Sequence, residues 1–437
     1  MSLGPLQGHA EALLVQLWTR ARVDWGWISD RLADAFRRER GLGSRERRQI
    51  AEALYATTRQ FRRIEHALLG AGPVLRGDAL ARAELLAQMV LAGEVAPAAA
   101  RETMPGVDWD HVAAVDARIA KERDPVRRLG LARSLPDWLA EKLLAERGPE
   151  EADALAAALS DRAPLAVRAN RIKIDRTALA TKLEAEGIST RPSTVTPDGL
   201  ILETRTNVFG LAAFQAGELE VQDEASQLVA ELVLPGRLTV VDFCAGAGGK
   251  ALALGAVMGN KGRLLALDVH AKKLEELRRR SRRAGLTNVQ ALAIEEETWP
   301  PEVANLVGKA DRVLVDAPCS GIGALRRNPE ARWRLTPEDV ARFPALQLAI
   351  LRRASRLVTP GGRLIYATCT VLRDENQGVV EKFLAEDAGW TPIRPAEVLS
   401  AERAFGKTDA SGTALELMPH RHGTDGFFAI ALRRTGS

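Results

Sequence analysis

The sequence predicts an α/β protein in which a doubly wound parallel sheet forms the second half, preceded by an all-α region and a small α+β unit. From Leu6 to Leu131, Ala, Leu and Arg recur at three- and four-residue spacing, which is typical of packed amphipathic helices. From Leu238 onward, short apolar runs alternate with helical stretches. This alternation is the pattern of a parallel sheet that is covered by helices.

The boundaries between these parts follow from changes along the 437 residues, a length that exceeds one ordinary core. The helical texture changes near Pro136, and PLAVRANRIKI from Pro164 then alternates apolar and basic residues as a half-exposed strand does. The pair Pro235-Gly236 marks the next break. We therefore predict an all-α domain at 1–135, a small α+β domain at 136–235 and the α/β domain at 236–437.

The elements of the second half can be read in order. The expected strands contain LTVVDF from Leu238, RLLALD from Arg263, VQALAI from Val289, VLVD after Arg312 and RLIYAT after Gly362. Helices are expected to begin at Gly249 and to cover 271–284 and 343–357. Because helices separate these short β-rich runs, the strands are expected to be parallel.

Composition excludes several classes of protein. The chain is 46% hydrophobic and 27% charged, and no window approaches the roughly 18 uncharged apolar residues that a membrane span needs. No secretory signal is evident, so a cytoplasmic protein without membrane contact is expected. Three widely separated cysteines form no zinc-type spacing, so no metal is expected. The net charge of +4, carried mostly by arginine, permits a polyanionic partner.

A glycine cluster lies where the first strand of the second half turns into a helix. Gly246, Gly248 and Gly249 allow the backbone to approach a ligand closely, and the next strand ends at Asp268, where a carboxylate can accept both ribose hydroxyls of an adenosyl group. This pattern describes both NAD and S-adenosylmethionine sites. A strict G-x-G-x-x-G is absent because Ala251 takes the last glycine position, and the Walker spacing is not met.

The cysteines Cys244, Cys319 and Cys369 each follow an apolar strand. The carboxyl ends of parallel strands open onto one crevice, so all three thiols are expected at the same edge of the sheet. The alternative, cysteine as a small core residue, fits Cys244 best because its strand and glycine turn leave little room.

Two thiols and an acid suit one kind of methyl transfer. Methylation of an exocyclic amine typically uses Asp/Asn-Pro-Pro-aromatic after this strand, whereas here Pro318 is followed by a thiol. The C5 carbon of a pyrimidine becomes nucleophilic only after a thiolate adds to C6. That reaction needs a nucleophile, an acid and a base, and two cysteines with Asp316 supply such groups without showing which thiol attacks.

At this point a family resemblance becomes specific. Phe243-CAGAGGK, Asp316-Ala-Pro-Cys319-Ser-Gly-Ile-Gly with Leu325-RRNPEARW, and Tyr366-ATCT followed by Asp374-Glu-Asn376 resemble the signatures of the RsmB/NSUN family of RNA cytosine-C5 methyltransferases. The N-terminal helices resemble, more loosely, the NusB-like RNA-binding domain of the bacterial RsmB branch. The resemblance implies a Rossmann-like methyltransferase domain and S-adenosyl-L-methionine as methyl donor.

The resemblance also implies roles for individual residues. Cys369, in the Thr-Cys motif, would be the nucleophile, and Cys319, in the Pro-Cys motif, the group needed for product release. Asp316 would contact the target cytosine, and Lys250 would close the donor loop, although a helix residue that extends into water is the alternative for Lys250. The donor-binding set would be Cys244, Ala245, Gly246, Ala247, Gly248, Gly249, Lys250, Asp268, Glu296 and Asp316.

Three positions depart from the family pattern. Ala247 replaces the proline of the usual Ala-x-Pro-Gly-Gly-Lys loop, which removes a rigid turn residue. The usual aspartate on the adenine side is missing, and Glu296 within Glu295-Glu-Glu297 is the expected substitute. Thr370 stands where serine is more usual and retains a hydroxyl.

RNA contacts are expected directly after the Pro-Cys loop, at Arg326, Arg327, Asn328 and Trp333. Arginines there could hold the phosphates of an extruded nucleotide. Trp333 could stack on a base or pack within the loop, and the residues alone leave both open. The arginine-rich run at 278–283 is interpreted as a solvated helix face.

The leading hypothesis is therefore an S-adenosylmethionine-dependent RNA m5C methyltransferase that acts on 16S ribosomal RNA as a monomer. A transfer-RNA methyltransferase is the near alternative. A non-catalytic RNA-binding or ribosome-assembly factor could keep the same fold, and an enzyme that methylates a protein or small molecule is a weaker rival. Intact Cys319, Cys369, Asp316 and Lys250 favour the catalytic hypothesis.

Overall fold

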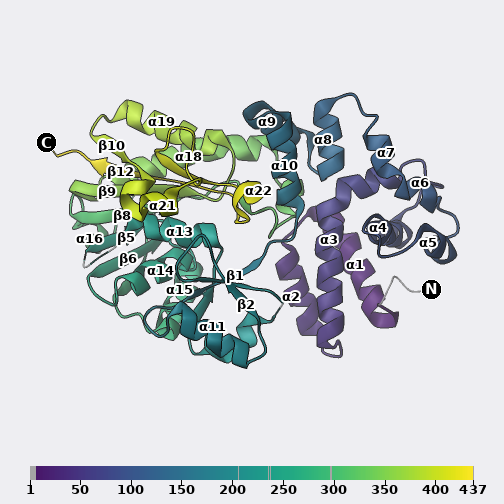
Figure 1. The fold of residues 1–437 in the computed structure, drawn as a ribbon, viewed down its shortest axis with the longest axis horizontal. Helices are drawn as coiled ribbons and strands as arrows, with labels where there is room; N and C mark the ends of the chain where they lie inside the picture. The colour runs from purple at the N-terminus through teal and green to yellow at the C-terminus, as the bar shows by residue number, and fades with distance from the viewer. Residues whose placement is uncertain (1–5, 205, 235, 237, 296–297, 437) are drawn as a thin grey trace. The chain divides into compact units, whose positions relative to one another are not determined.

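The computed structural model describes residues 6–204, 206–234, 236, 238–295 and 298–436. The chain divides into two compact units (Figure 1). The first unit comprises Met1–Arg162 together with Ala324–Pro337, and the second comprises Ala163–Gly323 together with Glu338–Ser437. The chain thus leaves the second unit just after the Pro-Cys loop and returns to it 14 residues later. The division into three domains at 1–135, 136–235 and 236–437 stays a prediction.

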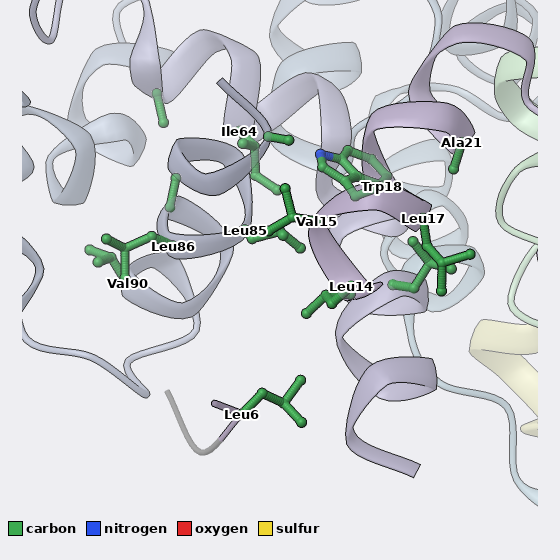
Figure 2. Close-up of a cluster of buried hydrophobic side chains, with 14 of the residues drawn as sticks. Leu6, Leu14, Val15, Leu17, Trp18, Ala21, Ile64, Leu85, Leu86 and Val90 are labelled. Carbon is green, nitrogen blue, oxygen red and sulfur yellow. The ribbon is translucent and has the colours of Figure 1, made fainter. Parts of the chain in front are cut away.

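The first unit is helical, as the Ala, Leu and Arg spacing predicted. Leu14, Val15 and Trp18 lie in a buried cluster with Ile64 and Leu85, and Figure 2 shows these side chains gathered between their helices. Two helices, Asp137–Arg147 and Pro149–Ser160, are separated by Gly148, which adopts a φ of 75°. The helices of the unit are α1 (Gly8–Asp24), α2 (Ile28–Arg38), α3 (Ser44–Leu68), α4 (Gly77–Leu91), α5 (Pro97–Thr103), α6 (Trp109–Ala113), α7 (Val115–Ile119), α8 (Pro125–Arg133), α9 (Asp137–Arg147), α10 (Pro149–Ser160) and α17 (Ala331–Arg334).

The second unit begins with a small antiparallel sheet in the strand order β2-β3-β1-β4. Its elements are β1 (Leu165–Ala169), α11 (Arg176–Ala185), β2 (Thr190–Pro192), β3 (Gly199–Leu202), η1 (Val208–Gly210), α12 (Ala212–Gln215) and β4 (Leu219–Val221). The expectation of a half-exposed β1 is wrong, since Ala166–Ala169 are buried. Arg168 is buried because its Nε donates to Gln222 Oε1 at 2.7 Å. Burial lowers the pKa of Arg168 to about 10.

The large sheet confirms the predicted α/β class. Its strand order is β10-β12-β9-β8-β5-β6-β7, with β11 paired to β12. Strands β5 to β9 are parallel, and β12 runs antiparallel to β9. The strands are β5 (Thr239–Asp242), β6 (Arg263–Asp268), β7 (Val289–Ala293), β8 (Ala310–Asp316), β9 (Val358–Thr368), β10 (Trp390–Ile393), β11 (Ala414–Leu417) and β12 (Phe427–Arg434).

Helices cover both faces of this sheet (Figure 1). Val240 faces a cluster with α13, α14 and α15, whereas its neighbour Val241 faces a cluster with α16, α18 and α19, as the two-residue period of a strand requires. The helices of this part are α13 (Glu224–Val233), α14 (Gly249–Val257), α15 (Ala271–Ala284), α16 (Pro301–Ala304), η2 (Ile322–Ala324), α18 (Pro337–Ser355), η3 (Arg373–Glu375), α19 (Gln377–Glu386), α20 (Pro395–Leu399), α21 (Ala401–Ala404) and α22 (Pro419–His422).

The strand order places the expected site. β5 lies between β6 and β8, and Val241 pairs with Leu265 on one side and Val313 on the other. Chain order therefore reverses direction at β5, and in open α/β sheets ligands bind at the carboxyl ends of the strands at such a point. The glycine loop, Asp268, Asp316 and Cys369 all follow or end strands at this edge.

Candidate active site

The loop from β5 to α14 is held in a conformation that needs glycine. Gly246 and Gly248 have φ of 55° and 90°, values that residues with a Cβ rarely adopt. A Cβ on Gly248 would also lie 2.7 Å from Cγ of Leu277, whereas one on Gly246 or Gly249 would meet no atom within 4 Å. The loop therefore packs closely on α15 at Gly248 and leaves open space at the other two glycines, as a ligand-binding loop must.

Asp268 connects the end of β6 to this loop. Its carboxylate is 8% exposed and accepts the backbone N–H groups of Gly246 and His270, both at 2.8 Å. Each carboxylate oxygen can accept more than one hydrogen bond, so contact with a ribose hydroxyl is still possible. Glu296, the expected substitute for the adenine-side acid, lies outside the described residues.

Lys250 and Asp316 form an ion pair at the strand ends. Lys250 Nζ lies 2.7 Å from Asp316 Oδ2 and 4.8 Å from the ring centroid of Phe427. Burial alone would lower the pKa of Lys250, but the charge and hydrogen bond of Asp316 outweigh it, so the pKa is raised. Lys250 is 6% exposed, so the alternative that it extends into water is wrong.

A second acid, Asp242, lies beneath this pair and was missed by sequence reasoning. It is 1% exposed, and among the described residues its carboxyl oxygens accept no well-formed hydrogen bond, although the Ala251 backbone is close enough to lower its pKa slightly. Burial, followed by the charge of Asp316, raises the pKa of Asp242 to about 8. The position of Asp242 directly before the glycine loop could have indicated a site residue. An acid at the end of a strand, however, is equally consistent with an exposed side chain.

The structure brings two of the three thiols together. The Sγ atoms of Cys319 and Cys369 lie 3.4 Å apart, each partly buried. The hydrogen bond with Cys369 and burial raise the pKa of Cys319 well above its usual value. Cys244 instead packs against the apolar cluster that contains Phe243, and burial likewise raises its pKa. The core-residue alternative accounts for the position of Cys244.

The residues expected to contact RNA belong to the first unit. The ring of Trp333 lies 5.8 Å from that of Trp25 and 5.6 Å from that of Phe61, centroid to centroid, and its indole N–H donates to the Thr58 carbonyl at 2.9 Å. Packing rather than stacking on a base therefore accounts for where Trp333 lies. The neighbouring candidates are Arg326, which is 7% exposed, and Arg327 and Asn328, which are half-buried.

The arginine-rich run on α15 is not simply a solvated face, and that interpretation is wrong for part of it. Arg280 donates to the Ala247 carbonyl at 2.8 Å and to Glu220 at 2.9 Å, and Arg283 also pairs with Glu220. Glu220 is 4% exposed. These contacts connect the glycine loop and α15 to the small sheet, whereas Arg282 is exposed as expected.

A parallel sheet with a glycine loop after β5, an acid at the end of β6 and reactive side chains after β8 and β9 defines a Rossmann-like methyltransferase. Family models agree: "16S rRNA methyltransferase RsmB/F" matches residues 232–433, and the "Methyltr_RsmF/B-like, ferredoxin-like domain" matches residues 135–209.

Individual proteins extend the match to most of the chain. The chain is 36% identical over 318 residues to a "Probable ribosomal RNA small subunit methyltransferase B" of Bacillus subtilis, covering 72% of this chain and 69% of the relative. It is 33% identical over 407 residues to a "Ribosomal RNA small subunit methyltransferase B" of Xylella fastidiosa, covering 89% and 90%. The crystal structure of PH0851 shares the fold over 98% of this chain and 100% of that chain, with a TM-score of 0.76 and 24% identity.

The chain belongs to the RsmB/F family of methyltransferases and is an enzyme. The crystal structure of NSun6 from Pyrococcus horikoshii with SFG also shares the fold, over 69% of this chain and 99% of that chain, with a TM-score of 0.61 and 21% identity. Among the described residues, no group of three or more His, Cys, Asp or Glu side chains could hold a metal ion. Within the same residues, no helix is both long and apolar enough to cross a membrane.

Proposed function

We propose that this enzyme transfers a methyl group from S-adenosylmethionine to C5 of a cytosine in 16S ribosomal RNA, through a covalent bond between Cys369 and C6. The observation that carries the proposal is the pair of thiols, 3.4 Å apart, at the same strand ends as the buried Lys250–Asp316 pair. Cys369 lies close enough to Lys250 to be among the groups that raise the pKa of Lys250, after Asp316.

The two sulfur atoms lie within hydrogen-bond distance of each other, and either thiol could be the donor. Cys369 is assigned as the nucleophile and Cys319 as the release group because they stand in the Thr-Cys and Pro-Cys motifs of the family signatures.

In the proposed reaction, these side chains attack the base, stabilise the charge that develops on it and assist release of the product. The Cys369 thiolate forms a bond to C6, and the electrons of the C5–C6 double bond move onto the ring, where charge at N3 or the carbonyl is stabilised by the Lys250–Asp316 pair. Bound S-adenosylmethionine would supply the methyl group to C5, with cleavage of its S–CH3 bond, and would leave as S-adenosylhomocysteine. Loss of the C5 proton to a base expels Cys369 and restores the double bond, and Cys319 is the adjacent group that we assign to this release.

The identity of the methyl donor and that of the RNA substrate are supported by separate observations. Open space beside Gly246 and Gly249, together with Asp268 at the end of β6, fits an adenosyl ligand. The relatives named above are ribosomal RNA small subunit methyltransferases, which supports ribosomal RNA over transfer RNA as substrate. A non-catalytic factor on the same fold would have no use for a buried Lys–Asp pair beside two close thiols.

The test is covalent trapping on unmodified ribosomal RNA with methyl-labelled S-adenosylmethionine. On denaturing gels, Cys319→Ala should give a labelled RNA–protein band, because release is blocked after methyl transfer. Cys369→Ala should give neither band nor product, and Cys319→Ala/Cys369→Ala should give no band. Cys244→Ala is the thiol control and should accumulate no RNA–protein band, because Cys319 and Cys369 both remain. Turnover by Cys369→Ala would refute the assigned nucleophile.

A further inference from the structure

Glu375 lies at the end of η3, directly after the Thr-Cys loop, and is fully buried. A buried carboxylate is stable only when hydrogen-bond donors surround it. Burial raises the pKa of Glu375, and donors from Ser320, Gln347 and Thr370 oppose that rise. No step of the proposed chemistry uses this acid. The presence of so many hydrogen-bond donors around one carboxylate therefore needs a separate explanation.

The partners come from both thiol-bearing loops. The N–H of Ser320, next to Cys319, donates to Glu375 Oε2 at 2.8 Å, and the Ser320 hydroxyl donates to Oε1. The Thr370 hydroxyl, next to Cys369, donates to Oε1 at 3.2 Å. The hydroxyls of Ser320 and Thr370 are themselves 2.9 Å apart. One carboxylate therefore binds the residue that follows each thiol.

Two further contacts fix this carboxylate to the scaffold. On α18, Gln347 Nε2 lies 2.9 Å from Glu375 Oε2 and 3.0 Å from the carbonyl of Pro318. The hydroxyl of Tyr366, on β9, donates to the Glu375 carbonyl at 2.6 Å. The loops that carry the two thiols are thereby attached to a helix and a central strand, the rigid elements that hold functional side chains most precisely.

We propose that Glu375 is the positioning residue that sets the separation of the Cys319 and Cys369 sulfur atoms. It touches neither sulfur through a hydrogen bond and acts through the backbone and hydroxyl of their neighbours. The inference rests on the proposed function, in which attack by one thiol and release by the other require both at one face of the base. A small change in loop position would affect the chemical steps, whereas the donor loop and Asp268 would be unchanged.

The variant Glu375→Gln tests this with little change in volume. Its amide NH2 would face donors of Ser320 or Gln347 in place of an acceptor, which leaves a buried donor unsatisfied. We expect kcat to fall about tenfold or more, with KM for RNA and the dissociation constant for S-adenosylhomocysteine nearly unchanged. Asp374→Asn, at the exposed neighbouring acid, is the matched control and should keep the wild-type kcat.

A probe of the thiol pair separates this inference from the reaction itself. Phenylarsine oxide binds two adjacent thiols with release of one water, and it needs neither RNA nor donor. Wild type should bind it, Cys319→Ala should not, and Glu375→Gln should bind it more weakly. Should Glu375→Gln fail to fold, Gln347→Met removes the contacts to Glu375 and Pro318 without adding charge, and the same changes in smaller size are expected.

The outcomes are distinguishable. Wild-type kcat and wild-type arsenical binding in Glu375→Gln, or in Gln347→Met where the first variant does not fold, would overturn the positioning role. An absence of any covalent RNA adduct in Cys319→Ala would instead contradict the proposed function, whatever the arsenical shows. Reduced arsenical binding together with reduced kcat and constant ligand affinities is the result that supports the inference.

Discussion

Replacement of Trp333 by alanine should destabilise the first unit. The sequence left this residue open between stacking on RNA and packing within the protein, and the two roles differ in their thermodynamic consequences. In the structure, the ring contacts Trp25 and Phe61 edge-on or tilted, and its N–H donates to Thr58. An alanine would leave a gap in this aromatic cluster and remove the donor.

The magnitude follows from these contacts. Truncation of a fully buried Phe or Trp to alanine costs about 3–5 kcal/mol, and Trp333 is only half-buried. An aromatic pair adds about 0.5–1.5 kcal/mol and a typical hydrogen bond about 1 kcal/mol. Because these terms overlap, we expect a loss of about 2–4 kcal/mol, and domains of about 150–250 residues lose roughly 2–4 °C in Tm for each kcal/mol.

The assay is thermal unfolding followed by circular dichroism at the helical signal, with RNA binding measured on the same preparations. Trp27→Ala is the matched control, because Trp27 is 41% exposed and stacks with the guanidinium of Arg334 at 3.8 Å within the same unit. It should lose much less stability. Unchanged unfolding of Trp333→Ala together with weaker RNA binding would refute the packing argument and restore the base-stacking alternative.

Two further predictions concern a loop contact and a buried acid. Arg280→Ala removes the donor to the Ala247 carbonyl and should weaken S-adenosylhomocysteine binding about fivefold or more by calorimetry, whereas the exposed Arg282→Ala should not. Burial raises the pKa of Glu84 to about 7 despite its hydrogen bond from Trp18. Since the folded-state pKa exceeds the unfolded one, this group stabilises most below about pH 4.5 and loses that contribution as pH rises through 7. Glu84→Gln, neutral throughout, should therefore show a smaller fall in Tm over that interval, and parallel curves would contradict the raised pKa.

The sequence was most informative where the sheet itself determines position. The side chains after parallel strands must share one edge, so the sequence alone predicted that Asp316, Cys319 and Cys369 lie at the same edge of the sheet. The glycine pattern likewise located the loop, and the structure explains Gly248 by its φ and by the closeness of Leu277. Local order along the chain is enough for such inferences.

Contacts between segments that are distant in sequence could not be predicted from such local patterns. Arg168 alternates with apolar residues as an exposed strand residue would, yet it is buried because Gln222 supplies an acceptor. Arg280 looked like part of a charged helix face, but its partners Ala247 and Glu220 lie 33 and 60 residues away in sequence. A polar residue's partner determines whether it can be buried, and that partner is not visible in a local pattern.

The segment after the Pro-Cys loop shows why this matters for function. Arg332 is 1% exposed and donates to the carbonyls of Ser134 and Leu159 at 3.2 and 3.0 Å, and burial lowers its pKa to about 9. A guanidinium buried in this way is stable only while those carbonyls are present. The segment begins at Ala324, five residues after Cys319. The first unit therefore supplies the hydrogen-bond acceptors that allow Arg332 to be buried. The folded conformation of a segment that begins five residues after a proposed catalytic thiol depends on these acceptors.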